Sequence, residues 1–157
     1  MDALTLTIRR DSPLAPEVRA LLQRHLALMW ASSPAESVHA LAPDDLAGED
    51  VAFFTLRDGA VVLGMGALRR IDARHAEIKS MHVVAEARGR GLARLLLDHL
   101  LDQARATGYA RLSLETGIEA VFAPARALYA AAGFSACPPI PGYCPDPHSV
   151  FMTRTLA

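Results

Sequence analysis

Residues 86–101, EARGRGLARLLLDHLL, constrain the fold most, because a glycine- and arginine-rich loop runs without a break into a leucine-rich segment. The leucine spacing predicts a helix over residues 91–107, which Gly108 would end. Its expected buried stripe consists of Leu92, Leu95, Leu96 and Leu100. The preceding segment, HAEIKSMHVV, reads as a strand, so the chain passes from strand to loop to amphipathic helix.

The loop itself predicts an anion site. The first N–H groups of a helix have no partner within the helix and lie at the positive end of its dipole. Gly89 and Gly91 would let the backbone approach an anion closely, and Arg88 and Arg90 could add charged contacts. A polyphosphate is therefore the expected ligand. An ordinary tight turn with two exposed arginines is the alternative interpretation.

The remaining pattern predicts an α/β (α+β) fold with one mixed, mostly antiparallel sheet of about six or seven strands flanked by helices. We expect residues 1–157 to form one domain, since the sequence has no repeat and no low-complexity linker. Strands are predicted over residues 3–10, 75–84, 109–116, 134–137 and 149–156. Two further strands are predicted within residues 51–71, joined by the Asp58-Gly59 turn. The other predicted helices are residues 16–30 and 122–134.

The strand before the glycine loop alternates in its side chains. Simple alternation predicts that Ala76, Ile78, Ser80 and His82 face one way, whereas Glu77, Lys79, Met81 and Val83 face the other.

Composition excludes several classes of function. The net charge of −1 argues against a general attraction to nucleic acid or to an anionic membrane. No stretch approaches the ~20 apolar residues of a membrane span, and the N-terminus lacks a signal-peptide pattern. We therefore expect a cytoplasmic protein in which Cys137 and Cys144 are free thiols. Neither the cysteines nor the scattered histidines form a metal-binding pattern, so we expect no metal.

Among polyphosphates, a dinucleotide is one candidate, because Gly89-x-Gly91 precedes a helix and Glu115 ends the next strand, where a ribose-binding acid would lie. Arg94, however, occupies the position of the third glycine, and antiparallel strands precede the loop. A P-loop is excluded, since the chain has no Gly-Lys-Ser/Thr.

A family resemblance narrows the choice. Arg88-x-x-Gly91-x-Ala93, after EIKSMHV, resembles the acetyl-coenzyme A signature of the GNAT superfamily of N-acetyltransferases. LSLETG and ARALYAAAGF resemble its later strand and its helix ending in Leu-Tyr-x-x-x-Gly-Phe. SSPAESVHAL and the closing PPIPGYCPDPHSVFMTRTL are similar to a subgroup of small, little-characterised bacterial members. The resemblance spans nearly the whole chain.

The resemblance implies acetyl-CoA as cosubstrate. The backbone groups of Met81, His82 and Val83 would pair with pantetheine beside a splayed neighbouring strand, and one N–H would polarise the thioester carbonyl. The amides of Arg88, Gly89, Arg90, Gly91, Leu92 and Ala93 would hold the pyrophosphate.

The resemblance also implies direct attack of a neutral amine on the thioester. Tyr129 of the Leu-Tyr helix would be the acid that protonates the departing thiolate, unless it is only a packed aromatic or a coenzyme contact. Glu115 matches the position of the base in some relatives, with Glu77 and His82 as the other candidates. Phe122 stands where many relatives place a coenzyme-contacting asparagine, which puts the local coenzyme geometry in doubt.

The acceptor is less well defined. In this fold its pocket would be walled by the first helix, the loop after it and the final hairpin, where Trp30, Ser33, His39, Tyr143 and His148 lie. A small amine or amino-acid-like metabolite is the first expectation, and a protein N-terminus or lysine is the second. The alternative class is a coenzyme A-binding sensor or partner module without catalysis. A homodimer is one candidate state of assembly.

Overall fold

The computed structural model describes residues 6–156, which form one seven-stranded sheet in the order β1-β2-β3-β4-β5-β7-β6. Its strands are β1 (Leu6–Arg10), β2 (Val51–Asp58), β3 (Val61–Asp72), β4 (His75–Val83), β5 (Arg111–Gly117), β6 (Ser135–Ala136) and β7 (Ser149–Thr155). Only β4 and β5 pair in parallel, so the predicted mixed, mostly antiparallel α/β sheet is confirmed. Residues 3–5 of the first predicted strand lie outside the described residues.

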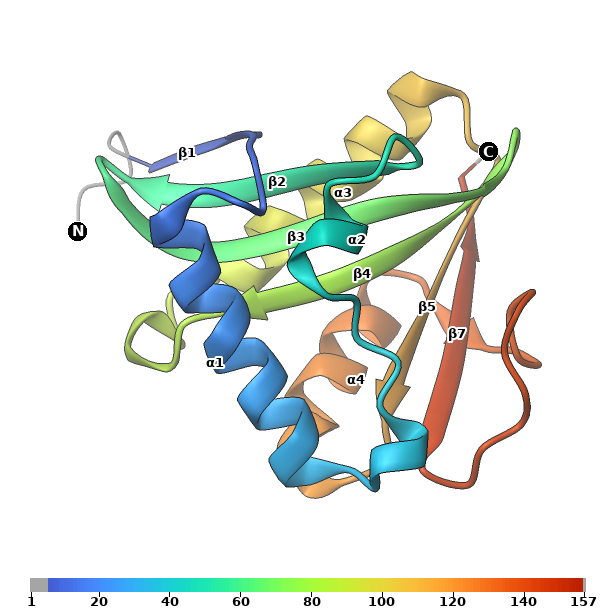
Figure 1. Ribbon diagram of the computed structural model, residues 1–157. Helices are drawn as coiled ribbons and strands as arrows, with labels where there is room; N and C mark the ends of the chain where they lie inside the picture. The colour runs from blue at the N-terminus through green and yellow to red at the C-terminus, as the bar shows by residue number, and fades with distance from the viewer. Residues whose placement is uncertain (1–5, 157) are drawn as a thin grey trace.

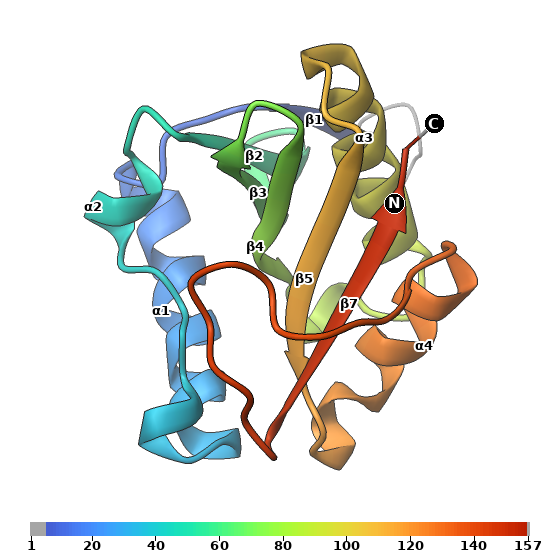
Figure 2. The same cartoon turned by 90° about the vertical axis from the view of Figure 1, so that its right-hand side faces the viewer.

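Helices cover both faces of this sheet (Figures 1 and 2). They are α1 (Pro16–Ser32), α2 (Pro43–Leu46), α3 (Leu92–Thr107) and α4 (Ala123–Ala131), with three short 3-10 helices at Ala35–Ser37, Ala85–Ala87 and Ala120–Phe122. Figure 2 shows α1 and α2 on one side of the sheet and α3 and α4 on the other. Two apolar cores result, one between the sheet and α1 and one between the sheet and the pair α3 and α4.

The buried stripe of α3 differs from the predicted one at three leucines. Leu92, Leu96 and Leu100 are buried as expected, but Leu95 is 46% exposed, and Leu97 and Leu101 are buried instead. Since each residue turns the helix by about 100°, the buried rows follow i and i+4 steps from Leu92 and Leu97, and Leu95 falls on the opposite side. The prediction for Leu95 was wrong.

β4 contains a bulge near its end. Met65 pairs with His82, and Ala67 pairs with Lys79. The chain therefore advances two residues along β3 but three along β4 between these pairs, so β4 holds one extra residue. Ser80 has a left-handed backbone with φ of 57°, which non-glycine residues seldom adopt. The parallel pairing with β5 ends at Ile78 and Leu114, and beyond that point the two strands diverge (Figure 1).

The extra residue reverses the side-chain alternation of β4. Met81 packs against the α3 and α4 core together with Ile78, and its Sδ lies 3.7 Å from the Tyr129 hydroxyl. His82 instead reaches α1, with its Nδ1 3.1 Å from that of His25. Simple alternation was therefore wrong for Met81 and His82, because a one-residue bulge exchanges the two faces of a strand.

No helix within residues 6–156 has both the length and the apolar character required to cross a membrane.

Candidate active site

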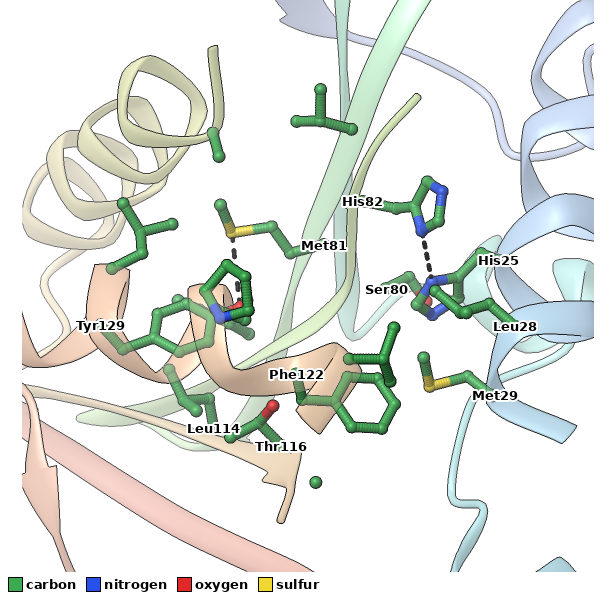
Figure 3. A pocket seen from close by; sticks show the side chains of 18 of the residues that line it. His25, Leu28, Met29, Ser80, Met81, His82, Leu114, Thr116, Phe122 and Tyr129 are labelled. Carbon is green, nitrogen blue, oxygen red and sulfur yellow. Dashed lines mark hydrogen bonds between the residues drawn. The ribbon is translucent and has the colours of Figure 1, made fainter. Parts of the chain in front are cut away.

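A cavity of about 470 Å³ opens where β4 and β5 diverge. Its walls come from α1 and the segment after it, the second half of β4, the glycine loop with the start of α3, the end of β5, and α4. Figure 3 shows side chains from these elements facing a common space. The parted strands thus create an opening that connects the start of α3 with the α1 side of the sheet.

The glycine loop leaves the start of α3 uncapped. Gly91, the N-cap, has φ of 73°, Gly89 has φ of 82°, and no side chain caps the first turn. A Cβ on either glycine would meet nothing within 4 Å, so the space before these amides is open. The first-turn N–H groups can therefore donate hydrogen bonds to an anion.

The residues expected to bind the coenzyme come together around this opening. Met81, His82, Val83, Arg88, Gly89, Gly91, Leu92 and Ala93 all line the cavity, and Arg94 joins them. Arg90 is not among its lining residues. The Arg88 Nε donates to the Val83 carbonyl at 3.4 Å, so this side chain bridges the end of β4 and the loop.

A pair of neutral histidines forms the wall between β4 and α1. His25 is 7% exposed, and its burial, together with His82 and Lys79, lowers its pKa to about 3. Burial and the charges of Arg88 and Arg24 lower the pKa of His82 to about 4. The single proton between the two Nδ1 atoms is donated by one neutral ring and accepted by the other.

Sequence reasoning missed this pair. The sequence did contain a signal for a buried histidine, because His25 continues the helical spacing of Val18, Leu21 and Leu22. All four residues are buried on one face of α1. A histidine on a buried helix face needs a polar partner, and the bulge in β4 provides one.

Tyr129 on α4 points into the same cavity (Figure 3). It is 7% exposed, and burial raises its pKa to about 12. The phenol therefore keeps its proton throughout the neutral range. That hydroxyl donates to the Met81 sulfur at 3.7 Å, a weak bond that a better acceptor could replace.

The other end of the cavity holds a carboxylate and an imidazole. Both oxygens of Glu115 lie within hydrogen-bond distance of the His39 Nδ1, at 2.9 Å and 2.8 Å, and the Ser149 hydroxyl donates to Oε2 at 2.7 Å. Nearby, the Ser33 hydroxyl donates to Glu119 at 2.8 Å. Thus Ser33, His39 and Glu115, predicted from the sequence, all line one end of the cavity.

Other predicted residues lie elsewhere. Trp30 is 57% exposed and is not part of the cavity wall. Glu77 is fully buried behind the wall, where Arg69 donates to it at 2.7 Å and the Tyr143 hydroxyl also donates at 2.7 Å. Tyr143 is likewise absent from the lining, but Lys79, which donates to it at 2.9 Å, does line the cavity. Burial and the Glu77 carboxylate raise the pKa of Tyr143.

Phe122 lies against Gly117 at the mouth of the cavity. A Cβ on Gly117 would overlap the Phe122 ring, so the glycine permits this close packing. Phe122 is 9% exposed and contributes apolar surface to the cavity at the position where the sequence resemblance implied an asparagine.

Within the described part of the chain, no three His, Cys, Asp or Glu side chains are placed to share a metal ion. Cys137 and Cys144 are free. The cavity presents uncapped amides, a protonated phenol and a carboxylate–imidazole pair. Such a set can bind a phosphate ester at one end and transfer protons near the other.

Comparisons with known proteins agree with this arrangement. The model of the Acetyltransferase (GNAT) family matches residues 16–134. The "Uncharacterized N-acetyltransferase YsnE" of Bacillus subtilis is 44% identical, covering 95% of this chain and 99% of that protein. The "IAA acetyltransferase" of Azospirillum brasilense is 39% identical, covering 96% and 98%. A solved structure of a Klebsiella pneumoniae protein assigned as an acyl-CoA N-acyltransferase has a TM-score of 0.80 and 29% identity, covering 97% and 98%.

Proposed function

The chain belongs to the GNAT family of acetyltransferases, and we propose that it transfers the acetyl group of acetyl-CoA to a small primary amine. One observation carries the coenzyme assignment: the uncapped first turn of α3 opens into the cavity beside the gap between β4 and β5. The pyrophosphate would bind the amides of residues 88–93, and pantetheine would lie along Met81–Val83.

The cavity's residues suit a direct transfer. A neutral amine attacks the thioester carbonyl, and the tetrahedral intermediate collapses with breakage of the carbon–sulfur bond. The leaving thiolate then takes a proton from the Tyr129 hydroxyl, which its raised pKa keeps protonated in the neutral range. The nitrogen loses its surplus proton toward the pair formed by Glu115 and His39, and the Tyr129 phenolate regains a proton from solvent, so the products are the amide and the free thiol.

The shape of the acceptor end supports a small amine with an apolar body. Leu28, Met29 and Phe122 give this end an apolar lining, and Glu115 supplies negative charge for an incoming ammonium group. The relative from Azospirillum brasilense is named for IAA, so IAA belongs in any acceptor panel. Protein N-termini form the second acceptor class to be tested.

Two measurements test this proposal. Isothermal titration calorimetry measures acetyl-CoA binding, and release of free thiol is followed with phenethylamine, benzylamine, glycinamide, IAA and a short peptide. We expect binding and turnover with an apolar primary amine. Binding without any thiol release would favour a coenzyme-binding module, which the replacement of asparagine by Phe122 would suit.

Gly91→Glu tests the phosphate site directly. A carboxylate before the α3 amides would repel the pyrophosphate, so acetyl-CoA binding should be lost. Gly108→Ala is the matched control, because Gly108 is also left-handed, with φ of 100°, at the other end of the same helix. It should cost about 1 kcal/mol of stability but leave binding intact. Unchanged affinity in Gly91→Glu would refute the phosphate site.

A further inference from the structure

We propose that His39 is the base that deprotonates the acceptor amine, and that Glu115 is a positioning residue for its ring. This inference rests on the acetyl transfer proposed above. It assigns the proton transfer to the segment after α1, and it gives the carboxylate at the end of β5 an indirect role.

The hydrogen bonds fix which nitrogen of His39 is basic. Both Glu115 oxygens face the His39 Nδ1 at 2.9 Å and 2.8 Å, and a carboxylate can only accept. The neutral ring therefore carries its proton on Nδ1, and Nε2 keeps the lone pair. The same carboxylate also accepts from the Ser149 hydroxyl at 2.7 Å, so its oxygens are already engaged.

The backbone of His39 is held as well as its ring. Lys79 Nζ donates to the His39 carbonyl at 3.0 Å and to the Tyr143 hydroxyl at 2.9 Å, and Tyr143 donates in turn to Glu77. The rings of His39 and Tyr143 meet edge to face with centroids 5.2 Å apart. Residues of β4, of β5 and of the segment before β7 thus hold this one histidine in place.

Exposure separates the two candidate bases. Both line the cavity, but the His39 side chain is 31% exposed and the Glu115 side chain only 11%. The more exposed imidazole can receive a proton from the acceptor and pass it to water, whereas the carboxylate is largely enclosed. A base must reach the proton that it removes, so this geometry favours His39.

The proton balance is simple. The acceptor's ammonium group gives one proton to Nε2, which leaves a neutral amine with the lone pair needed for attack. The resulting imidazolium donates from Nδ1 to Glu115, whose negative charge stabilises it. The imidazolium then loses the proton from Nε2 to solvent, which restores the starting tautomer.

The titratable and charged groups that face His39 are Glu115 from β5, Lys79 from β4, and Tyr143 and Asp146 from the segment before β7. Lys79 reaches the backbone carbonyl and not the ring, so Glu115 has the closest charge to Nδ1.

The kinetic experiment compares His39→Ala with Glu115→Gln, using the best amine of the panel above. His39→Ala should lower kcat/KM by about 100-fold or more and recover activity with added imidazole. Glu115→Gln should lower kcat/KM by a smaller factor and gain no activity from imidazole. His75→Ala, at the far end of β4, controls for unspecific effects of imidazole.

A larger loss in Glu115→Gln than in His39→Ala, or no rescue by imidazole, would overturn the assignment. Two-bond proton–nitrogen NMR of the wild-type ring gives a second readout that needs no acceptor: a proton on Nε2 and none on Nδ1 would also overturn it. Failure of the proposed function looks different, since acetyl-CoA would not bind or no amine would release thiol from the wild-type protein.

Discussion

The histidine pair between α1 and β4 should make the protein sensitive to acid. His25 titrates with a pKa of about 3 in the folded protein, against ~6.5 in an unfolded chain. Between these values the unfolded state binds the extra proton, so the free energy of unfolding falls as pH drops through 6.5. The slope is at most 1.36 kcal/mol per pH unit, so protonation of His25 in the unfolded state should lower the free energy of unfolding by about 2 kcal/mol between about pH 7.5 and pH 5.

His25→Asn isolates this contribution. Asparagine can still bond the Nδ1 of His82, but it does not titrate. Urea denaturation followed by circular dichroism should show wild type losing about 2 kcal/mol more than the variant over that pH range. Leu21→Ala is the control on the same face of α1, since it should lower stability equally at both pH values. An identical pH dependence in wild type and His25→Asn would refute the buried neutral ring.

Two further variants test the acid and the core. Tyr129→Phe should lower kcat by about 100-fold while acetyl-CoA affinity changes little, as measured by steady-state kinetics and calorimetry; an unchanged kcat would show that the hydroxyl is not the acid. Leu100→Ala should reduce the free energy of unfolding by about 2–5 kcal/mol, because Leu100 is fully buried. Leu95→Ala on the same helix should cost far less, and equal losses would contradict the observed stripe.

The fold could be predicted largely because its signals are local. The Asp58-Gly59 turn, the glycine that ends α3 and the strand–loop–helix order each depend on a few neighbouring residues. The error at Leu95 arose because a leucine-rich helix offers more leucines than one stripe can bury. Only the packing of α3 against β3 and β4 selects Leu97 and Leu101 in its place.

The site could be predicted only where its residues are close together in the sequence. The loop residues follow from motif and spacing, and the cavity gathers most of them. His39 and Ser149, which bond to Glu115, and Tyr143, which bonds to Glu77 and Lys79, lie 34 to 76 residues from their partners in the chain, and periodicity cannot pair residues so far apart. Tyr143 illustrates the limit: its sequence position suggested a contact with the acceptor, but its hydroxyl bonds to Glu77 behind the wall.

The bulge at Ser80 lowers the stability of the fold at a point in the wall of the cavity. Its left-handed backbone and the buried Ser80 hydroxyl, which has no partner among the described residues, each cost about 1–3 kcal/mol. Without the extra residue, regular alternation would direct Met81 toward α1 and His82 toward Tyr129, and the His25 ring would be buried without its partner. The same irregularity coincides with the end of pairing between β4 and β5. Ser80 also lines the cavity, so the strained residue lies in the wall of the space in which the coenzyme is proposed to bind.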